Sequence, residues 1–150
     1  MGWTDDVSLA TALRDGLKTN YPGFVQGTIP QSPLSRHSEV NTLYYSPHAL
    51  LSHNFEERIN FCNLAAQAIF GYTADEAIGM LSLDLVPEGL KQGREKLFET
   101  VIHEQRLAVV ETKRITKPGR IIDIRAHVFP YELQPGKHSI AAVVEMILDG

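Results

Sequence analysis

The sequence predicts an α+β protein built around one five-stranded antiparallel sheet. Two short segments of strand character, 48–53 and 58–62, precede a block of helical period, and three more follow it, at 107–116, 121–129 and 139–147. Short turn-forming segments separate consecutive strands within each group, as antiparallel hairpins require. The two early strands must therefore join the three late strands across the helices.

The N-terminal segment is predicted to be a helix followed by irregular chain. Residues 4–19 carry an apolar stripe of helical period, and Thr4 is the expected N-cap, with two acids after it that suit the helix dipole. Gly16 weakens this helix but does not forbid it. The passage 21–36 contains three prolines and two glycines, which indicates an irregular connection lying on the domain. Residues 43–45 are expected to form a short turn.

The central helical block has clear start and stop signals. Asn63 stands where the period changes from two to that of a helix, and its side chain is the expected N-cap. Gly71 suits the positive φ that closes a helix, and Thr73 followed by Glu76 is a capping box that opens a second, short helix. Gly79 ends that second helix.

The long helix of the domain is predicted from Leu90 to Glu104. Its apolar positions, which include Leu97 and Val101, are expected to face the core, while the charged residues, including Arg94, are expected to face solvent. The last strand is almost continuously apolar, which indicates a central strand covered on both faces.

Composition excludes several classes of protein. The 150 residues suit about one domain, and no apolar run approaches the roughly 20 residues that a membrane helix needs. The N-terminus lacks the pattern of a secretory signal, so we expect a cytoplasmic location. A net charge of -4 gives no footprint for nucleic acid. The single cysteine, Cys62, cannot form an internal disulfide or build a cysteine metal site.

The central block resembles the PAS domain. That family follows a hydrophobic strand with Asn-x-Ala-Ala, then Phe-Gly-Tyr-Thr, then Glu and Gly at similar spacing. The matching residues here are Ile59, Phe61, Asn63, Ala65, Ala66, Phe70, Gly71, Tyr72, Thr73, Glu76 and Gly79. The resemblance implies strand order 2-1-5-4-3, helices on one face and a ligand-sized cavity between them and the sheet. It covers residues 46–148 and leaves 1–45 as an N-terminal extension of the kind that mediates dimers in the family.

A narrower resemblance concerns the two early strands. The run Leu50-Leu51-Ser52-His53 and the run from Ile59 to Ala66, together with the helical extension, are similar to the PAS-related MEKHLA group. Nothing known of that group assigns chemistry to Ser52 or His53.

The resemblance implies a set of cavity residues whose role is shape and burial. We expect the lining to include Phe61, Ala66, Phe70, Leu85, Leu97, Val101, Ile122, Ile124 and Val144. Glu111 and Glu145 occur in otherwise apolar strands, so either could be a polar anchor for a ligand. The alternative is that each lies on the outer face or at a strand end, because Glu is seldom fully buried.

Two residues were weighed as cofactor ligands by resemblance. The flavin-binding light sensors among PAS domains carry a reactive cysteine on a helix, whereas Cys62 lies on a strand and lacks the neighbours of that motif. A small core residue is the alternative. Haem-binding PAS sensors take their iron ligand from a histidine near the end of the long helix, where His103 stands. The residues after His103 depart from that pattern, and a histidine in the last helical turn also complements the dipole.

Other chemistry-bearing residues do not form a recognisable constellation. Ser52 and His53 are adjacent on a strand, so they point to opposite faces and cannot act as a nucleophile and base. Lys113 and Arg114 are expected to form a solvated sheet edge. Four histidines lack the spacing of a zinc site: His48, His53, His127 and His138.

These observations leave three hypotheses for function. The first is a non-catalytic sensory module that binds a small, mainly apolar or aromatic molecule and signals through a dimer or a separate partner protein. The second keeps the fold without a ligand and uses the N-terminal helix or an apolar sheet face, including Val110, for dimerisation. The third is a haem or flavin sensor. An enzyme is disfavoured, because no acid-base pair, nucleophile or phosphate loop can be placed.

Overall fold

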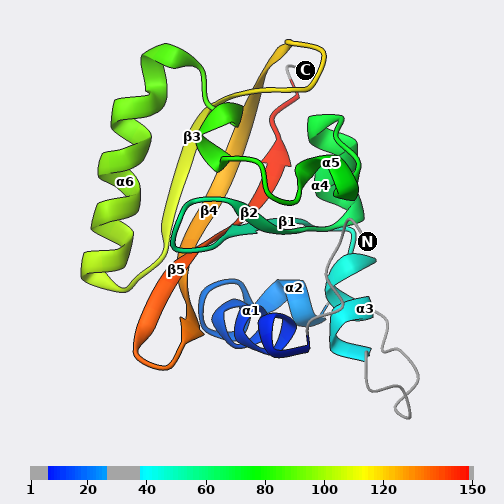
Figure 1. The fold of residues 1–150 in the computed structure, drawn as a ribbon, viewed down its shortest axis with the longest axis vertical. Coiled ribbons are helices and arrows are strands. Elements are labelled where there is room, and N and C mark those ends of the chain that lie inside the picture. The colour runs from blue at the N-terminus through cyan, green and yellow to red at the C-terminus, as the bar shows by residue number, and fades with distance from the viewer. Residues whose placement is uncertain (1–6, 27–37, 149–150) are drawn as a thin grey trace.

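The computed structural model describes residues 7–26 and 38–148 and contains the predicted sheet (Figure 1). All neighbouring strands are antiparallel, and their order is β2-β1-β5-β4-β3. The strand bounds are β1 (Ala49–His53), β2 (Ile59–Cys62), β3 (Ala108–Ile115), β4 (Ile121–Gln134) and β5 (Lys137–Met146). The predicted fold class and strand order are therefore confirmed.

One face of the sheet carries the central helical block and the long helix. These elements are α4 (Leu64–Phe70), α5 (Ala74–Ala77), the 3-10 turns η1 (Ser82–Leu85) and η2 (Glu88–Leu90), and α6 (Lys91–Glu104). Asn63 caps α4 by accepting a bond from Ala66, Gly71 closes it at φ 82°, and Thr73 and Glu76 form the capping box of α5. The predicted starts of α4 and α5 are confirmed. Helix α5 ends at Ala77, before the predicted Gly79, and the predicted first residue of α6, Leu90, belongs to η2.

The opposite face is covered by the N-terminal helices α1 (Val7–Asn20), α2 (Pro22–Gln26) and α3 (Ser38–Tyr44) (Figure 1). Leu13 and Leu17 of α1 are fully buried, and they belong to the same apolar cluster as Phe129 and Tyr131 of β4. Gly16 lets the helix approach the strand, since a Cβ added there would lie 3.1 Å from the Cβ of Tyr131. The N-terminal helices thus cover part of this face, while the part that carries Glu111 and Glu145 stays exposed.

The structure corrects several boundaries. The passage predicted to be irregular begins with helix α2, which is held by the buried side chain of Phe24, and the predicted turn at 43–45 is the end of helix α3. The predicted N-cap Thr4 and residues 27–36 lie outside the described residues. Strand β4 runs past its predicted end to Gln134, and β5 begins before its predicted start, at Lys137, because Tyr131 stays buried beneath α1.

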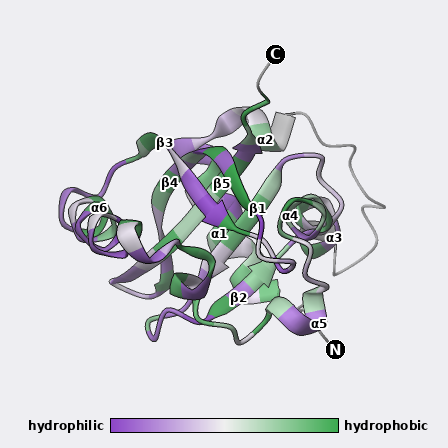
Figure 2. Ribbon diagram, turned by 90° about the horizontal axis from the view of Figure 1, so that it is seen from above, coloured by the Kyte–Doolittle hydropathy of each residue, from purple (hydrophilic) through white to green (hydrophobic). Residues whose placement is uncertain are grey.

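The residues of α6 that face the core differ from the predicted ones. Hydrophilic residues dominate it (Figure 2), and its only fully buried residues are Arg94 and Val101. Arg94 was predicted to face solvent, yet it is 5% exposed because it lies one turn from Phe98 and two turns from Val101 on the stripe that faces the sheet. No helix in the described part of the chain is long and apolar enough to cross a membrane.

Candidate functional site

A cavity of about 70 Å³ lies between the sheet and the layer formed by α4, η1 and α6. Its walls are mainly apolar, with Ile124, Ala126 and Val128 of β4 beside Ala142 and Val144 of β5. Five polar residues also line it, and they come from four different elements: Ser52 and His53 of β1, Ser82 of η1, Arg94 of α6 and Arg114 of β3.

The predicted lining residues divide into three groups. Phe70, Leu85, Ile124 and Val144 line the cavity. The second group, which belongs to the surrounding apolar core without reaching the cavity wall, consists of Ala66, Val101, Ile122 and the partly buried Leu97. The third group lies elsewhere in the fold.

Phe61 and Glu111, two residues expected at the cavity, do not line it. Phe61 is fully buried, but on the other side of the sheet, where it packs with α1 and α3. Glu111 and Glu145 lie on the outer face, where both carboxylates pair with Arg125 at 2.9 and 3.1 Å. Their side chains are 61% and 52% exposed, so neither is a polar anchor inside the cavity.

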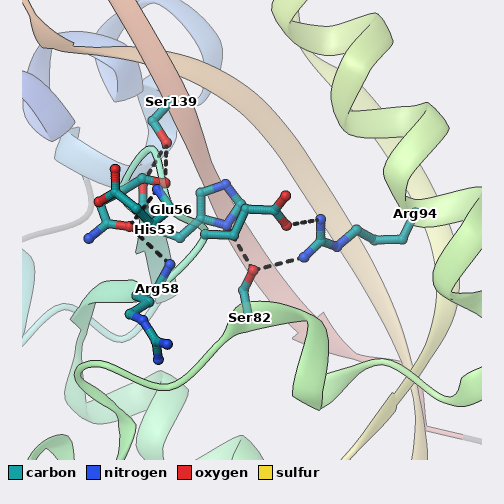
Figure 3. A network of polar contacts seen from close by, with 8 residues as sticks. His53, Glu56, Arg58, Ser82, Arg94 and Ser139 are labelled. Atoms are coloured by element: carbon teal, nitrogen blue, oxygen red, sulfur yellow. Dashed lines mark hydrogen bonds and ion pairs between the residues drawn. The ribbon is translucent and has the colours of Figure 1, made fainter.

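A polar network closes one end of the cavity (Figure 3). Arg94 donates to the Glu57 carboxylate at 2.7 Å and to the Ser82 hydroxyl at 2.8 Å, and its guanidinium lies 4.3 Å from the centre of the Phe98 ring. The Ser82 oxygen also lies 2.8 Å from Nδ1 of His53. The network ties the hairpin between β1 and β2 to η1 and α6.

The surroundings of His53 keep its ring neutral. The Ser82 oxygen accepts a bond from Arg94, and its contact with Nδ1 of His53 is compatible with either neutral tautomer of the ring. Burial, and then the charge of Arg94, lower the pKa of His53 to about 4 from 6.5. His53 is therefore neutral at pH 7, and it is a weak general base. Ser52 points to the opposite face, where its hydroxyl donates to Asn60.

Arg114 brings a second guanidinium to the cavity. It is half-buried on the inner face of β3, opposite Ile122 of β4, and among the described residues it forms no ion pair. Burial, and then the nearby charge of Arg94, lower the pKa of Arg114 to about 10 from 12.5. The predicted solvated edge is thus correct for Lys113, which pairs with the exposed Asp123, and wrong for Arg114.

A surface groove of about 490 Å³ adjoins the cavity. The groove runs between α6 and the two hairpins that carry Phe55 and His138. Four residues line both spaces: His53, Arg94, Phe98 and Ile140. These four residues therefore lie between the cavity and the groove.

The candidate cofactor ligands lie outside the cavity. His103 is exposed at the end of α6 and lines the outer groove, and a cavity of about 70 Å³ has no room for a haem macrocycle. Cys62 is buried on β2, and burial raises the pKa of its thiol to about 12, so it stays protonated. Across the described residues, no three His, Cys, Asp or Glu side chains are grouped as metal ligands.

Comparisons with solved structures identify the class of this fold. A PAS domain from Colwellia psychrerythraea superposes with a TM-score of 0.65 at 18% identity, covering 72% of this chain and 92% of that one. A PAS domain from Desulfitobacterium hafniense gives 0.61 at 20% identity, covering 71% and 99%. A PAS domain of a LuxR-family transcriptional regulator from Burkholderia thailandensis, in complex with ethanol, gives 0.59 at 15% identity, covering 72% and 96%. The fold is that of PAS domains.

The family can be stated more narrowly. The MEKHLA domain model matches residues 11–141, so the chain belongs to the MEKHLA domain family, and it has the fold of PAS domains. Comparison with curated protein sequences gave no match.

Proposed function

We propose that this MEKHLA domain is a non-catalytic sensory module that binds a small ligand in the cavity between the sheet and α6. The observation that supports it best is the combination of apolar walls with a cluster of polar side chains at one end of the cavity. A few convergent polar groups in an apolar cavity are typical of small-molecule sites. A ligand in the Burkholderia thailandensis PAS domain is as small as ethanol.

The volume limits the ligand. A cavity of about 70 Å³ is well below the roughly 300 Å³ at which ordinary ligand pockets begin, so the closed form accepts a molecule of only a few non-hydrogen atoms. A larger apolar or aromatic ligand would need Phe98 and Arg94 to move, which would join the cavity to the outer groove.

The proposed output is a change at a dimer interface or at the surface contacted by a separate partner protein. Helix α1 packs on its own sheet, so a homodimer would use the exposed side of α1 or the surface around it. The outer face of β3 and β4 is charged, and Val110, expected on an apolar outer face, is half-buried against the inner core.

Native mass spectrometry of freshly purified protein, compared with its denatured mass, tests this function. We expect an extra mass that is lost on denaturation, and we expect Ala126→Leu to remove it by filling the cavity. Ala68→Leu is the matched control, because Ala68 is exposed on α4 and does not line the cavity.

The second candidate is a ligand-free interaction module, which the small cavity volume favours. It predicts that the native mass of the monomer or dimer carries no extra mass over the denatured chain, both in wild-type protein and in Ala126→Leu. The same spectrum therefore separates the two functions.

A further inference from the structure

Arg114 places a positive charge at the cavity without a carboxylate partner among the described residues. Two other arginines with inward or sheet positions have carboxylate partners: Arg94 pairs with Glu57, and Arg125 pairs with Glu111 and Glu145. Arg114 is half-buried and lines the cavity, yet its hydrogen bond goes to the carbonyl of Lys113, and the described residues give it no carboxylate. A partly desolvated cation without an anion is costly, so an anionic ligand would be stabilised there.

Arg94 adds a second positive charge that favours an anionic ligand in the cavity. Its side chain is 3% exposed, and its bonds to Glu57 and Ser82 use two of the five N–H groups of a guanidinium. Glu57 is half-exposed, so much of its charge is hydrated, whereas the charge of Arg94 is not. The guanidiniums of Arg94 and Arg114 thus bring N–H donors to one small space, which His53 also lines.

The remaining walls limit the anion to one charge. Ile124, Ala126 and Val144 offer no polar side chain, so a second carboxylate would be buried without a partner. The volume of about 70 Å³ is little more than two waters occupy in the liquid, at roughly 30 Å³ each. A carboxylate head with a short alkyl tail satisfies both conditions, because planar carboxylates match the donor geometry of arginine.

We propose that the cavity binds a short-chain monocarboxylate, with its carboxylate at Arg114 and Arg94 and its alkyl tail against Ile124, Ala126 and Val144. This inference rests on the proposed sensory function and specifies the ligand class. Acetate and propionate are the members that match the cavity best, and longer acids require the wall of Arg94 and Phe98 to open.

Calorimetric and NMR titrations of the full chain in a carboxylate-free buffer test the inference, with propionate compared against 1-propanol and propylamine. We expect propionate to bind and the amine not to bind, with the alcohol weaker than the acid. Arg114→Gln is expected to weaken propionate by about tenfold or more without weakening the alcohol. Arg114→Lys should retain part of the affinity. Arg120→Gln is the matched control, because Arg120 is exposed in the adjacent hairpin turn and does not line the cavity.

Each outcome has a defined meaning. Equal binding of acid and alcohol, or a propionate affinity that Arg114→Gln leaves unchanged, would overturn the carboxylate assignment and leave a neutral-ligand sensor. Binding of none of the three probes by wild-type protein would also overturn it, and a native mass without ligand would then remove the proposed function as well. Because the comparison of acid with alcohol uses wild-type protein, it decides the question even if Arg114→Gln fails to fold.

Discussion

His53 is the residue through which folding stability should depend on pH. Burial and the charge of Arg94 lower its pKa in the folded protein to about 4, although Glu57 opposes this shift. The unfolded chain takes up a proton at His53 near pH 6.5, whereas the folded protein resists it. The stability from neutral His53 is therefore fully present above about pH 6.5 and is lost as pH falls through about 4, by at most about 3 kcal/mol.

Urea unfolding at about pH 5 and about pH 7 measures this dependence. We expect wild-type protein to lose more unfolding free energy across this interval than His53→Gln, because glutamine does not titrate. His103→Gln is the control, since His103 is exposed, and it should behave as wild type. A pH dependence that His53→Gln leaves unchanged would contradict the assignment.

Asn63 is predicted to be a stability centre well beyond its role as a helix cap. Its side chain is fully buried, and Oδ1 accepts bonds from the N–H groups of Ala66 and Leu50, while Nδ2 donates to the carbonyls of Leu43 and His48. One amide thus joins α3, β1 and α4. Asn63→Ala leaves these buried groups unpaired and should lower the free energy of unfolding by about 3 to 5 kcal/mol.

Thr73→Ala supplies the comparison for Asn63. Thr73 caps α5 at an exposed position, so its loss should cost only about 1 kcal/mol in the same urea titration. Losses of similar size in the two variants would show that Asn63 acts as a helix cap alone.

At the scale of secondary-structure elements, replacing two glycines inside helices should change the stability of the protein in opposite directions. Gly93 of α6 has open space around it, so Gly93→Ala should stabilise the protein by about 0.5 to 1 kcal/mol through helix propensity. Gly16 of α1 has the side chains of Phe129 and Tyr131 within 3.2 Å of an added Cβ. Gly16→Val should therefore lower the thermal midpoint, because α1 must move off β4. A neutral Gly16→Val would mean that this packing is loose.

The elements themselves could largely be predicted from the sequence, because they follow from local rules. Period, caps and turn residues located the strands and α4 to α6 to within a few residues. The strand order came from the family resemblance, since local pattern does not determine which strands pair. Alternation showed that Phe61 is buried on one face of β2, but the face depends on where α1 docks, and no local signal gives that.

The polar side of the cavity could not be predicted either, because it is built from residues that are far apart in the sequence. His53, Ser82 and Arg94 are 29 and 12 residues apart and meet only because the chain returns across the sheet. The position of Arg94 on the same helical stripe as Val101 was a usable signal, but its charge argued for solvent. Arg114 shares the inner face of β3 with Thr112, which alternation alone could have shown. The cavity is space left by imperfect packing, which sequence patterns do not encode.

Across the whole molecule, the cavity and helix α1 lie on opposite faces of the sheet and meet at His53. Its ring lines the cavity, while its backbone carbonyl accepts bonds from the hydroxyls of Tyr131 and Ser139, at 2.9 and 2.6 Å. Tyr131 also accepts a bond from Asn60 and packs beneath α1 close to Gly16. A change in the cavity that moves His53 should therefore alter the packing of α1.

Hydrogen exchange across α1 measures this coupling. We expect Ala126→Leu, which fills the cavity, to change the protection of residues 7–20. Tyr131→Phe should reduce that response while leaving the response of α6 intact, because it removes the hydroxyl bonds to His53 and Asn60 but keeps the ring. Tyr45→Phe is the matched control, because Tyr45 is 58% exposed. A response of α1 that persists unchanged in Tyr131→Phe would mean that the signal leaves the cavity by another route, with α6 as the element that carries it, since α6 forms the opposite wall through Arg94 and Phe98.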